Sequence, residues 1–264
     1  MLASIPDAQP SLVNPAFVYE PKYDGIRAIV EVIPGSGARF WSRNGNEKTA
    51  QFPDVREAVE TWAAKIRVPL VLDGEIVALD ADLKPAGFQR LQSRINISVP
   101  GYRSKKPILP PDQQPAALIV FDLLREGDDD LRAKPLGDRR ARLEALFKKH
   151  PSKSISLRMT EQAAGDGKAL LARAQAEDWE GLVVKSARSL YRAGKRTPEW
   201  IKFKLHKQDK FVIGGWTAPR GTRVGFGALI LGLKQPDGLR YVGDVGTGFN
   251  GAEIDRVMNL MQRI

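Results

Sequence analysis

Residues 20–33 read Glu-Pro-Lys-Tyr-Asp-Gly-Ile-Arg-Ala-Ile-Val-Glu-Val-Ile and place one lysine, Lys22, among acids, a glycine and an arginine. From residue 26 onward apolar side chains alternate with others, which predicts a strand with Arg27 on the face opposite the core. A lysine amine attacks only when unprotonated, so a site that uses one lowers its pKa by burial or by a neighbouring positive charge. Lys22 is therefore a candidate covalent nucleophile, and Arg27 is the candidate source of that charge. A solvated turn before a strand is the alternative.

Length and composition narrow the class of protein. A chain of 264 residues is long enough for two ordinary domains. Lys and Arg number 41 against 31 Asp and Glu, and the surplus of 10 positive charges favours nucleic acid as a partner. With no cysteine, disulfides and cysteine-ligated zinc are excluded. No signal peptide or membrane span is found, so we expect a soluble, cytoplasmic protein without a membrane partner.

Two further strands carry polar residues where chemistry would need them. The segment 39–45 predicts a strand with a polar end at which Arg43 lies. The segment 70–79 is apolar except for Asp73, Gly74 and Glu75 in its middle. Acids are costly inside an apolar strand unless they are used, and the alternative is an edge strand with both carboxylates in water.

Three later strands carry the remaining candidates. The run 116–124 contains Phe121, which either faces a ligand or packs in the core. Glu180 stands at the mouth of the next strand, where a carboxylate could reach a metal ion or a ligand, or could simply belong to a turn. In the segment 200–205, alternation places Lys202 and Lys204 on one face. Two ammonium groups on one strand face suit a polyphosphate, although a solvated face gives the same pattern.

Helices with an apolar stripe are predicted near 54–66, 137–149 and 166–178, with Asp54 as the N-cap of the first. A proline-rich surface loop is expected over 100–115. All of these are expected to be packing or connecting elements, with no chemistry of their own.

A polar connector at 205–210 marks the expected boundary between two domains. Beyond it, three short glycine-rich strands and a helix over 252–264 predict an incomplete small barrel. The glycines of 246–251 match a dinucleotide-binding pattern, but the remaining residues leave no room for the second strand and ribose-binding acid of that motif. They are expected to shape a turn instead.

Six motifs in order resemble one family. They are Lys-Tyr-Asp-Gly-Ile-Arg (22–27), Ser-Arg-Asn-Gly (42–45), Leu-Asp-Gly-Glu-Ile (72–76), Phe-Asp-Leu-Leu (121–124), Glu-Gly-Leu-Val-Val-Lys (180–185) and Trp-Ile-Lys-Phe-Lys (200–204). This order resembles ATP-dependent DNA ligases of the covalent nucleotidyltransferase superfamily, and is most similar to the ligase domain of bacterial end-joining ligase D. The resemblance implies an α+β fold, with an adenylation domain of antiparallel sheets flanked by helices over 1–206 and a partial OB-fold domain over 207–264.

The resemblance also implies a mechanism and a set of roles. Lys22 would attack the α-phosphorus of ATP to form lysyl-AMP, the AMP would pass to the 5′-phosphate of a nick in duplex DNA, and the 3′-hydroxyl would displace it. The implied nucleotide-binding residues are Glu20 at the adenine edge, Phe121 on its ring, Glu75 at the ribose, Arg27 and Arg43 near phosphate or sugar, and Lys202 and Lys204 on phosphate oxygens. Glu180 would act through Mg²⁺ or Mn²⁺, and the enzyme would be a monomer that works with repair or end-joining proteins.

The resemblance weakens toward the C-terminus. Ligases of this type carry a further basic motif late in the barrel, which the sequence does not match, so we expect either a fragment of a longer chain or a minimal form with an impaired first step. One alternative is an RNA ligase or a GTP-using capping-type enzyme, both of which resemble the same lysine motif. Another is a non-catalytic DNA-end-binding module, which the surplus of 10 positive charges and the incomplete barrel favour.

Overall fold

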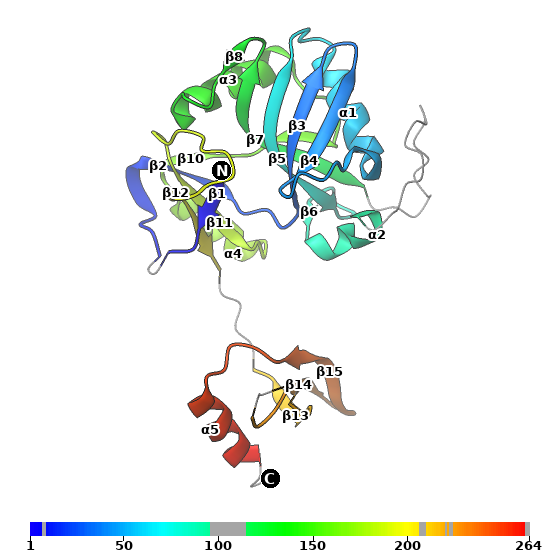
Figure 1. Cartoon of the computed structure of the whole chain (residues 1–264), viewed down its shortest axis with the longest axis vertical. Coiled ribbons are helices and arrows are strands. Elements are labelled where there is room, and N and C mark those ends of the chain that lie inside the picture. Colours follow the sequence, from blue (N-terminus) through cyan, green and yellow to red (C-terminus); the bar gives the residue numbers. More distant parts are fainter. Residues whose placement is uncertain (7–8, 96–114, 206–209, 220, 222–223, 262–264) are drawn as a thin grey trace. The chain divides into compact units, whose positions relative to one another are not determined.

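The structure is a computed structural model that describes residues 1–6, 9–95, 115–205, 210–219, 221 and 224–261. The chain forms two compact units, Met1–Leu205 and His206–Ile264 (Figure 1). Residues 206–209 of the expected connector and 100–114 of the expected loop lie outside the described residues.

The larger unit combines largely antiparallel sheets, each with one parallel strand pair, with short helices, which confirms the α+β fold class. Its strands are β1 (Leu2–Ser4), β2 (Val13–Pro21), β3 (Ile26–Ile33), β4 (Gly37–Ser42), β5 (Leu70–Leu79), β6 (Pro85–Ala86), β7 (Ala116–Glu126), β8 (Asp129–Asp130), β9 (Leu157–Met159), β10 (Ala163–Asp166), β11 (Gly181–Ser186) and β12 (Arg196–Lys204). Its helices are α1 (Pro53–Ala63), α2 (Gln92–Ile95), α3 (Leu136–Lys149) and α4 (Lys168–Ala176), with 3-10 turns η1 (Thr49–Gln51) and η2 (Phe88–Leu91).

Two sheets form the framework of this unit. One has the strand order β4-β3-β5-β7-β8, with β6 and β9 added to β5 and β7, and the other has the order β1-β12-β11-β2-β10. β5 lies between β3 and β7 and pairs with both of them along its length. The edge-strand interpretation of 70–79 is therefore wrong, since the acids of β5 stand in the middle of a sheet.

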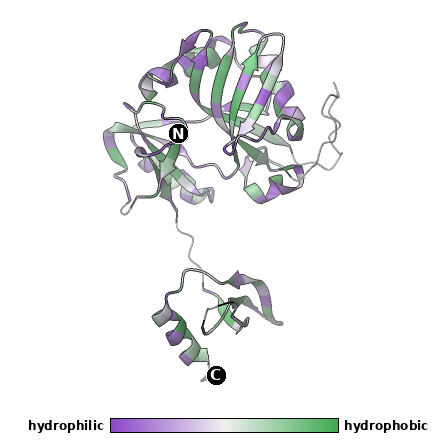
Figure 2. Ribbon diagram, viewed as in Figure 1, coloured by the Kyte–Doolittle hydropathy of each residue, from purple (hydrophilic) through white to green (hydrophobic). Residues whose placement is uncertain are grey.

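Helices cover the outer face of each sheet, and a third core lies between them. Alternate apolar side chains of β3, β5 and β7 pack against α1 and α3, where the rings of Trp62 and Phe147 lie 4.8 Å apart. α4 packs against the second sheet through Leu170 and Ala174. A smaller cluster joins residues of both sheets, among them Leu124 of β7 and Trp200 of β12. Figure 2 shows the hydrophobic colour concentrated on the central strands, with hydrophilic stripes on the helices.

The N-cap of helix α1 lies two residues earlier than expected, so the interpretation of Asp54 as the N-cap is wrong. Phe52 occupies the cap position without a side-chain bond, and Pro53 opens the helix. Proline suits the first helical position because its ring fixes φ and it has no N–H to leave unpaired. Asp54 lies instead in the first turn, where its carboxylate accepts bonds from the buried Arg94 guanidinium.

The smaller unit contains the strands β13 (Val212–Trp216), β14 (Leu229–Gln235) and β15 (Gly238–Val245) in one antiparallel sheet, followed by α5 (Gly251–Met261). Phe226 is fully buried and meets Phe249 edge-to-face at 5.2 Å. Asn250 and Glu253 form a reciprocal capping box, in which each side chain accepts a bond from the other residue's backbone N–H at 2.8 and 3.0 Å. The glycine-rich stretch 246–251 is thus the turn that starts α5.

Candidate active site

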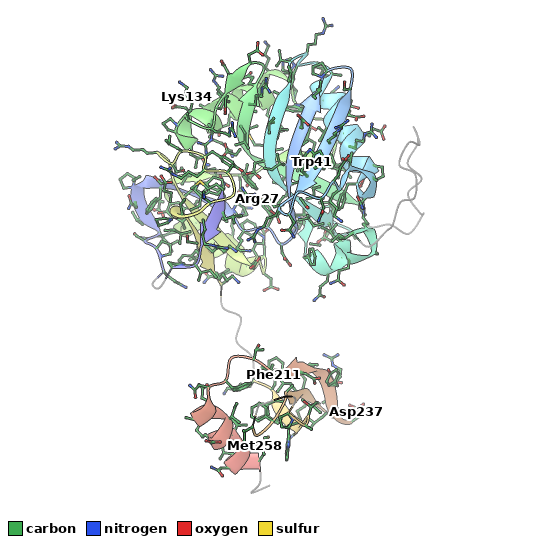
Figure 3. All side chains as sticks on the ribbon, viewed as in Figure 1. Arg27, Trp41, Lys134, Phe211, Asp237 and Met258 are labelled. Atoms are coloured by element: carbon green, nitrogen blue, oxygen red, sulfur yellow. The ribbon has the colours of Figure 1, made fainter. Side chains whose placement is uncertain are left out.

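A cleft of about 500 Å³ opens in the larger unit, and residues of both sheets line it. Its polar lining consists of Glu20, Lys22, Tyr23, Arg27, Ser42, Arg43, Asn44, Glu75, Lys185, Arg196 and Lys202. Its apolar lining consists of Leu2, Ala3, Pro21, Ile26, Phe88, Phe121, Val183 and Trp200. Arg27 is labelled in Figure 3, in the region where the two sheets face each other. A volume of this size is within the ordinary range for small-molecule and cofactor sites.

Lys22 follows β2 directly, and the pairing of β2 with β11 fixes its position. Pro21 pairs with Leu182, and the Lys22 N–H donates to the Gly181 carbonyl at 2.9 Å. Gly181 has φ +138, and a Cβ there would lie 2.1 Å from the Phe203 carbonyl oxygen, so only glycine fits between the strands. Glu180 precedes it, and its Oε2 accepts a bond from Lys22 Nζ.

Two more cations surround this carboxylate. Lys204 Nζ lies 3.7 Å from Glu180 Oε1 and is 45% exposed. Lys202 is half-buried and lines the cleft, and burial, together with the charges of Lys22 and Lys204, lowers the pKa of its ammonium. The alternation expected for 200–205 is confirmed, because Ile201 and Phe203 pack on the opposite face against α4.

Glu20 forms a buried ion pair at the inner end of the cleft. Its carboxylate, 3% exposed, accepts from Lys185 Nζ at 2.5 Å, and the Lys185 side chain is 2% exposed. Gln162 Nε2 donates to the other oxygen at 2.8 Å. The Lys185 ammonium also lies 4.3 and 4.2 Å from the ring centroids of Phe121 and Trp200, within cation–π range.

Arg27 is held by the middle of β5. Its Nε and Nη2 donate to the two oxygens of Asp73 at 2.9 and 2.5 Å, and its Nη1 donates to the Met1 carbonyl. Tyr191 donates its hydroxyl to Asp73 at 2.7 Å. The positive charge of Arg27 thus faces a carboxylate, whereas the charge of Lys22 is one of those that act on Lys202. The expectation that Arg27 supplies positive charge to Lys22 has no support in these contacts.

Glu75 stands directly across from Arg27 in the β3–β5 pairing. Burial raises the pKa of Glu75 to about 8, although the charges of Arg27 and Lys22 oppose the shift. Its side chain is therefore expected to carry a proton near neutral pH, so it can donate a hydrogen bond as well as accept one.

The structure brings together all the predicted site residues, though not equally. Eight of the nine contribute to the cleft lining or contact Lys22 directly, whereas Lys204 reaches the site only through Glu180. Phe121 was expected either to face a ligand or to pack in the core. It both lines the cleft and packs against the core between the sheets. Arg43 is exposed at the rim, just after the end of β4.

Sequence reasoning assigned no role to four side chains that the structure brings to the site, which are Asp73, Lys185, Tyr191 and Trp200. Asp73 and Lys185 had a usable signal, because each is a charge inside an apolar strand and such a charge needs a partner. Tyr191 and Trp200 had none, since aromatic residues in ordinary core positions look the same in sequence.

Among the described residues, no group of three or more His, Cys, Asp or Glu side chains is arranged to hold a metal ion. Mg²⁺ commonly binds through one or two carboxylates together with substrate phosphates, so this finding does not conflict with such an ion. Glu180 is the fitting donor, since it is 32% exposed and already lies beside three cations that suit phosphate. None of the described helices is long and apolar enough to cross a membrane.

Comparison with known proteins identifies the family. Residues 1–204 match the family model of the ATP dependent DNA ligase domain. The chain belongs to the ATP-dependent DNA ligase family. It is 34% identical over 248 residues to the multifunctional non-homologous end joining protein LigD of Mycolicibacterium smegmatis, covering 93% of this chain and 29% of that protein. The resemblance inferred from the six motifs is confirmed.

Solved structures of ligases give the same answer. The ligase domain of LigD from M. tuberculosis has a TM-score of 0.63 at 31% identity, over 98% of this chain and 76% of that one. A mycobacterial DNA ligase D complexed with ATP and MES has a TM-score of 0.61 at 30% identity, over 100% and 78% of the two chains. This likeness supports a nucleotidyltransferase unit followed by a half-barrel of OB-fold type. The chain spans under a third of the LigD proteins it matches, 29% and 27% of their lengths.

Proposed function

We propose that this chain catalyses ATP-dependent sealing of DNA nicks through a covalent lysyl-AMP. Lys22 Nζ would attack the α-phosphorus of ATP, so that an N–P bond forms, a P–O bond breaks and pyrophosphate leaves. The 5′-phosphate of a nick would next take the AMP from Lys22. The 3′-hydroxyl would then attack that phosphate and release AMP. Lys22 must lose a proton and part from Glu180 before the first attack.

The contacts suggest what each side chain does. We propose that Glu20 contacts the adenine edge, Phe121 stacks on the ring, Glu75 bonds the ribose, and Arg27 and Arg43 contact sugar or phosphate. Lys202 and Lys204 would neutralise phosphate oxygens as charge moves during transfer.

Mg²⁺ or Mn²⁺ would bind Glu180 together with phosphate oxygens. The ion would supply charge neutralisation on the nucleotide and the leaving group. The chain's own part is to hold the amine, the carboxylate and the two lysines on neighbouring strands, which the β2–β11–β12 pairing supports.

We further propose an assignment of domains and partners. Residues 1–206 would form the adenylation domain and residues 207–264 a partial OB-fold domain. The substrate would be nicked duplex DNA, the protein would act in the cytoplasm as a monomer, and its partners would be repair or end-joining proteins. The surplus of 10 positive charges supports DNA, because phosphate contacts release counterions. The affinity for a nicked duplex should therefore fall steeply with added salt. An affinity independent of salt would contradict the assignment of DNA as the substrate.

The single observation that supports this function best is a lysine whose amine lies against a carboxylate, between strands that also bring two further lysines to the same place. The test is incubation with ATP and Mg²⁺ followed by mass measurement of the intact protein. We expect a gain of one adenylate in the wild type and none in Lys22→Ala. Lys22→Arg should also remain unlabelled, because a guanidinium cannot become a free amine near neutral pH. Labelling by GTP alone would favour a capping-type enzyme, and nick binding without any labelling would favour a DNA-end-binding module.

A further inference from the structure

We propose that Tyr191 is a positioning residue for nucleotide transfer, which acts through the Asp73 carboxylate to fix the Arg27 guanidinium in the cleft. This inference rests on the proposed function, since it assigns to Tyr191 a part in the same reaction. It begins from Asp73, an acid in the middle of β5 whose side chain is fully buried.

Three hydrogen bonds satisfy the two oxygens of Asp73. Arg27 Nε donates to Oδ1 at 2.9 Å, and Oδ2 accepts both Arg27 Nη2 at 2.5 Å and the Tyr191 hydroxyl at 2.7 Å. An arginine–carboxylate pair with two parallel bonds defines the plane of the pair but can still rotate with the carboxylate. The hydroxyl of Tyr191 supplies a third point of attachment to the carboxylate, and it also accepts a longer bond of 3.4 Å from Arg27 Nη2. The carboxylate and the guanidinium are therefore held together in one orientation.

Tyr191 is itself fixed in place. It lies in the loop 187–195 between β11 and β12, and its backbone N–H donates to the Arg132 carbonyl at 2.9 Å. Its ring is 6.2 Å from that of Trp200, edge-to-face, and the Arg139 guanidinium lies 5.8 Å from its centroid. Burial, and then the charge of Asp73, raise the pKa of Tyr191, so its hydroxyl stays protonated and remains a donor.

The bond matters because it crosses from one sheet to the other. Lys22 follows β2 of the sheet that contains β11 and β12, whereas Arg27 and Asp73 belong to β3 and β5 of the other sheet. The Tyr191–Asp73 bond therefore ties the position of Arg27 to the sheet that carries Lys22. A nucleotide that contacts both Lys22 and Arg27 requires a fixed distance between these two side chains. Small misplacements of reacting groups lower the reaction rate strongly.

The test removes only the hydroxyl. In Tyr191→Phe, the first-order rate constant for self-adenylation at saturating ATP should fall about tenfold to a hundredfold, the change that loss of one hydrogen bond to a charged group corresponds to. The matched control is Tyr19→Phe, since Tyr19 is likewise a buried tyrosine, and its hydroxyl donates to the Ser11 carbonyl at 3.0 Å rather than to Asp73. That control should stay within about twofold of wild type.

A double-mutant cycle distinguishes positioning from general destabilisation. If Tyr191 acts through Asp73 on Arg27, then Tyr191→Phe should have almost no further effect on the rate in an Arg27→Ala background. Multiplicative effects of the two substitutions, or equal rates for Tyr191→Phe and Tyr19→Phe, would overturn the inference.

Calorimetric binding of ATP without Mg²⁺ is measured on the same four proteins of the cycle. This keeps the inference separate from the proposed function, because the cycle can be read from binding free energies even if the wild type forms no adenylate. Coupling in the cycle without adenylate formation would contradict the proposed function but would still support the positioning of Arg27 by Tyr191. Adenylate formation without coupling would support the proposed function and overturn the positioning role of Tyr191.

Discussion

The ion pair of Arg139 with Asp122 offers the sharpest test of how the larger unit is stabilised. Both side chains are fully buried, and two bonds of 2.8 Å join them. Arg139 Nη1 also donates to the Lys134 and Ser189 carbonyls at 2.6 and 3.1 Å. Substituting Arg139→Met preserves most of the volume but leaves Asp122 as an unpaired buried carboxylate.

The expected cost follows from that unpaired charge. Breaking one partner of a buried pair costs about 3–5 kcal/mol, out of a total stability of roughly 5–15 kcal/mol for a domain. For a unit of this size, about 1 kcal/mol corresponds to roughly 2–4 °C in Tm, so we expect a fall of roughly 6–20 °C. The matched control is Arg132→Met, whose pair with Asp130 is 54% exposed on both sides, and which should cost about 0–1 kcal/mol.

The effect should also depend on pH. Burial raises the pKa of Asp122 above its ordinary value, although Arg139 opposes the shift, so removing Arg139 raises it further. A raised folded-state pKa means that the native state binds a proton that the unfolded state releases, and stability falls as pH rises through that pKa. The Tm deficit of Arg139→Met should therefore be larger at pH 8 than at pH 5.

Thermal unfolding, followed by tryptophan fluorescence at both pH values, measures these differences. The double variant Asp122→Leu/Arg139→Met should recover most of the lost Tm, because replacing both partners by apolar side chains is often neutral. A double variant as unstable as the single one would refute the reasoning, since the cost would then come from lost packing or lost carbonyl bonds rather than from the unpaired carboxylate.

Two further predictions concern the cleft itself. Because the pKa of Glu75 is raised to about 8, the native state holds a proton that the unfolded state releases. The free energy of unfolding should therefore fall as pH rises from about 5 to 8, and it should fall less in Glu75→Gln. Urea titrations at several pH values measure this difference. Equal pH dependence in both proteins would contradict this. A Cβ at Gly25 would lie 2.2 Å from the Ile76 carbonyl oxygen, so Gly25→Ala should lower stability by more than about 1 kcal/mol, whereas Gly251→Ala, with nothing within 4 Å, should be tolerated; comparable denaturation midpoints would count against the close approach.

The strands of the site were predictable from sequence because two different signals coincided. β5 was expected over 70–79 and is found at Leu70–Leu79, since its apolar run is bounded by a proline and by polar residues. The alternation of side chains along a strand correctly placed Lys202 on the face opposite Ile201 and Phe203. Motif order then brought Lys22, Glu75 and Glu180 into one hypothesis.

What sequence could not supply was the pairing of charges across the two sheets. Whether a buried acid faces an arginine or a lysine depends on strand order, and non-local pairing leaves no periodic signal. For this reason Arg27 was expected to act on Lys22, while the structure pairs it with Asp73. The start of α1 was displaced for a local reason, because the preference of proline for the first helical position outweighed the capping preference of Asp54.

Under the proposed function, the cluster between the sheets has a consequence for the size of the nucleotide that the cleft admits. Phe121 and Trp200 belong both to this cluster and to the cleft wall, while Leu124 and Leu136 lie in the cluster without lining the cleft. Because the two share residues, we expect the thickness of this apolar layer to set how far apart the two walls stand. Replacing Leu124 by alanine would let the two walls move closer together, and it would change no residue that lines the cleft. Under the proposed function, Leu124→Ala should therefore change which modified nucleotides the cleft accepts, although Leu124 does not line the cleft.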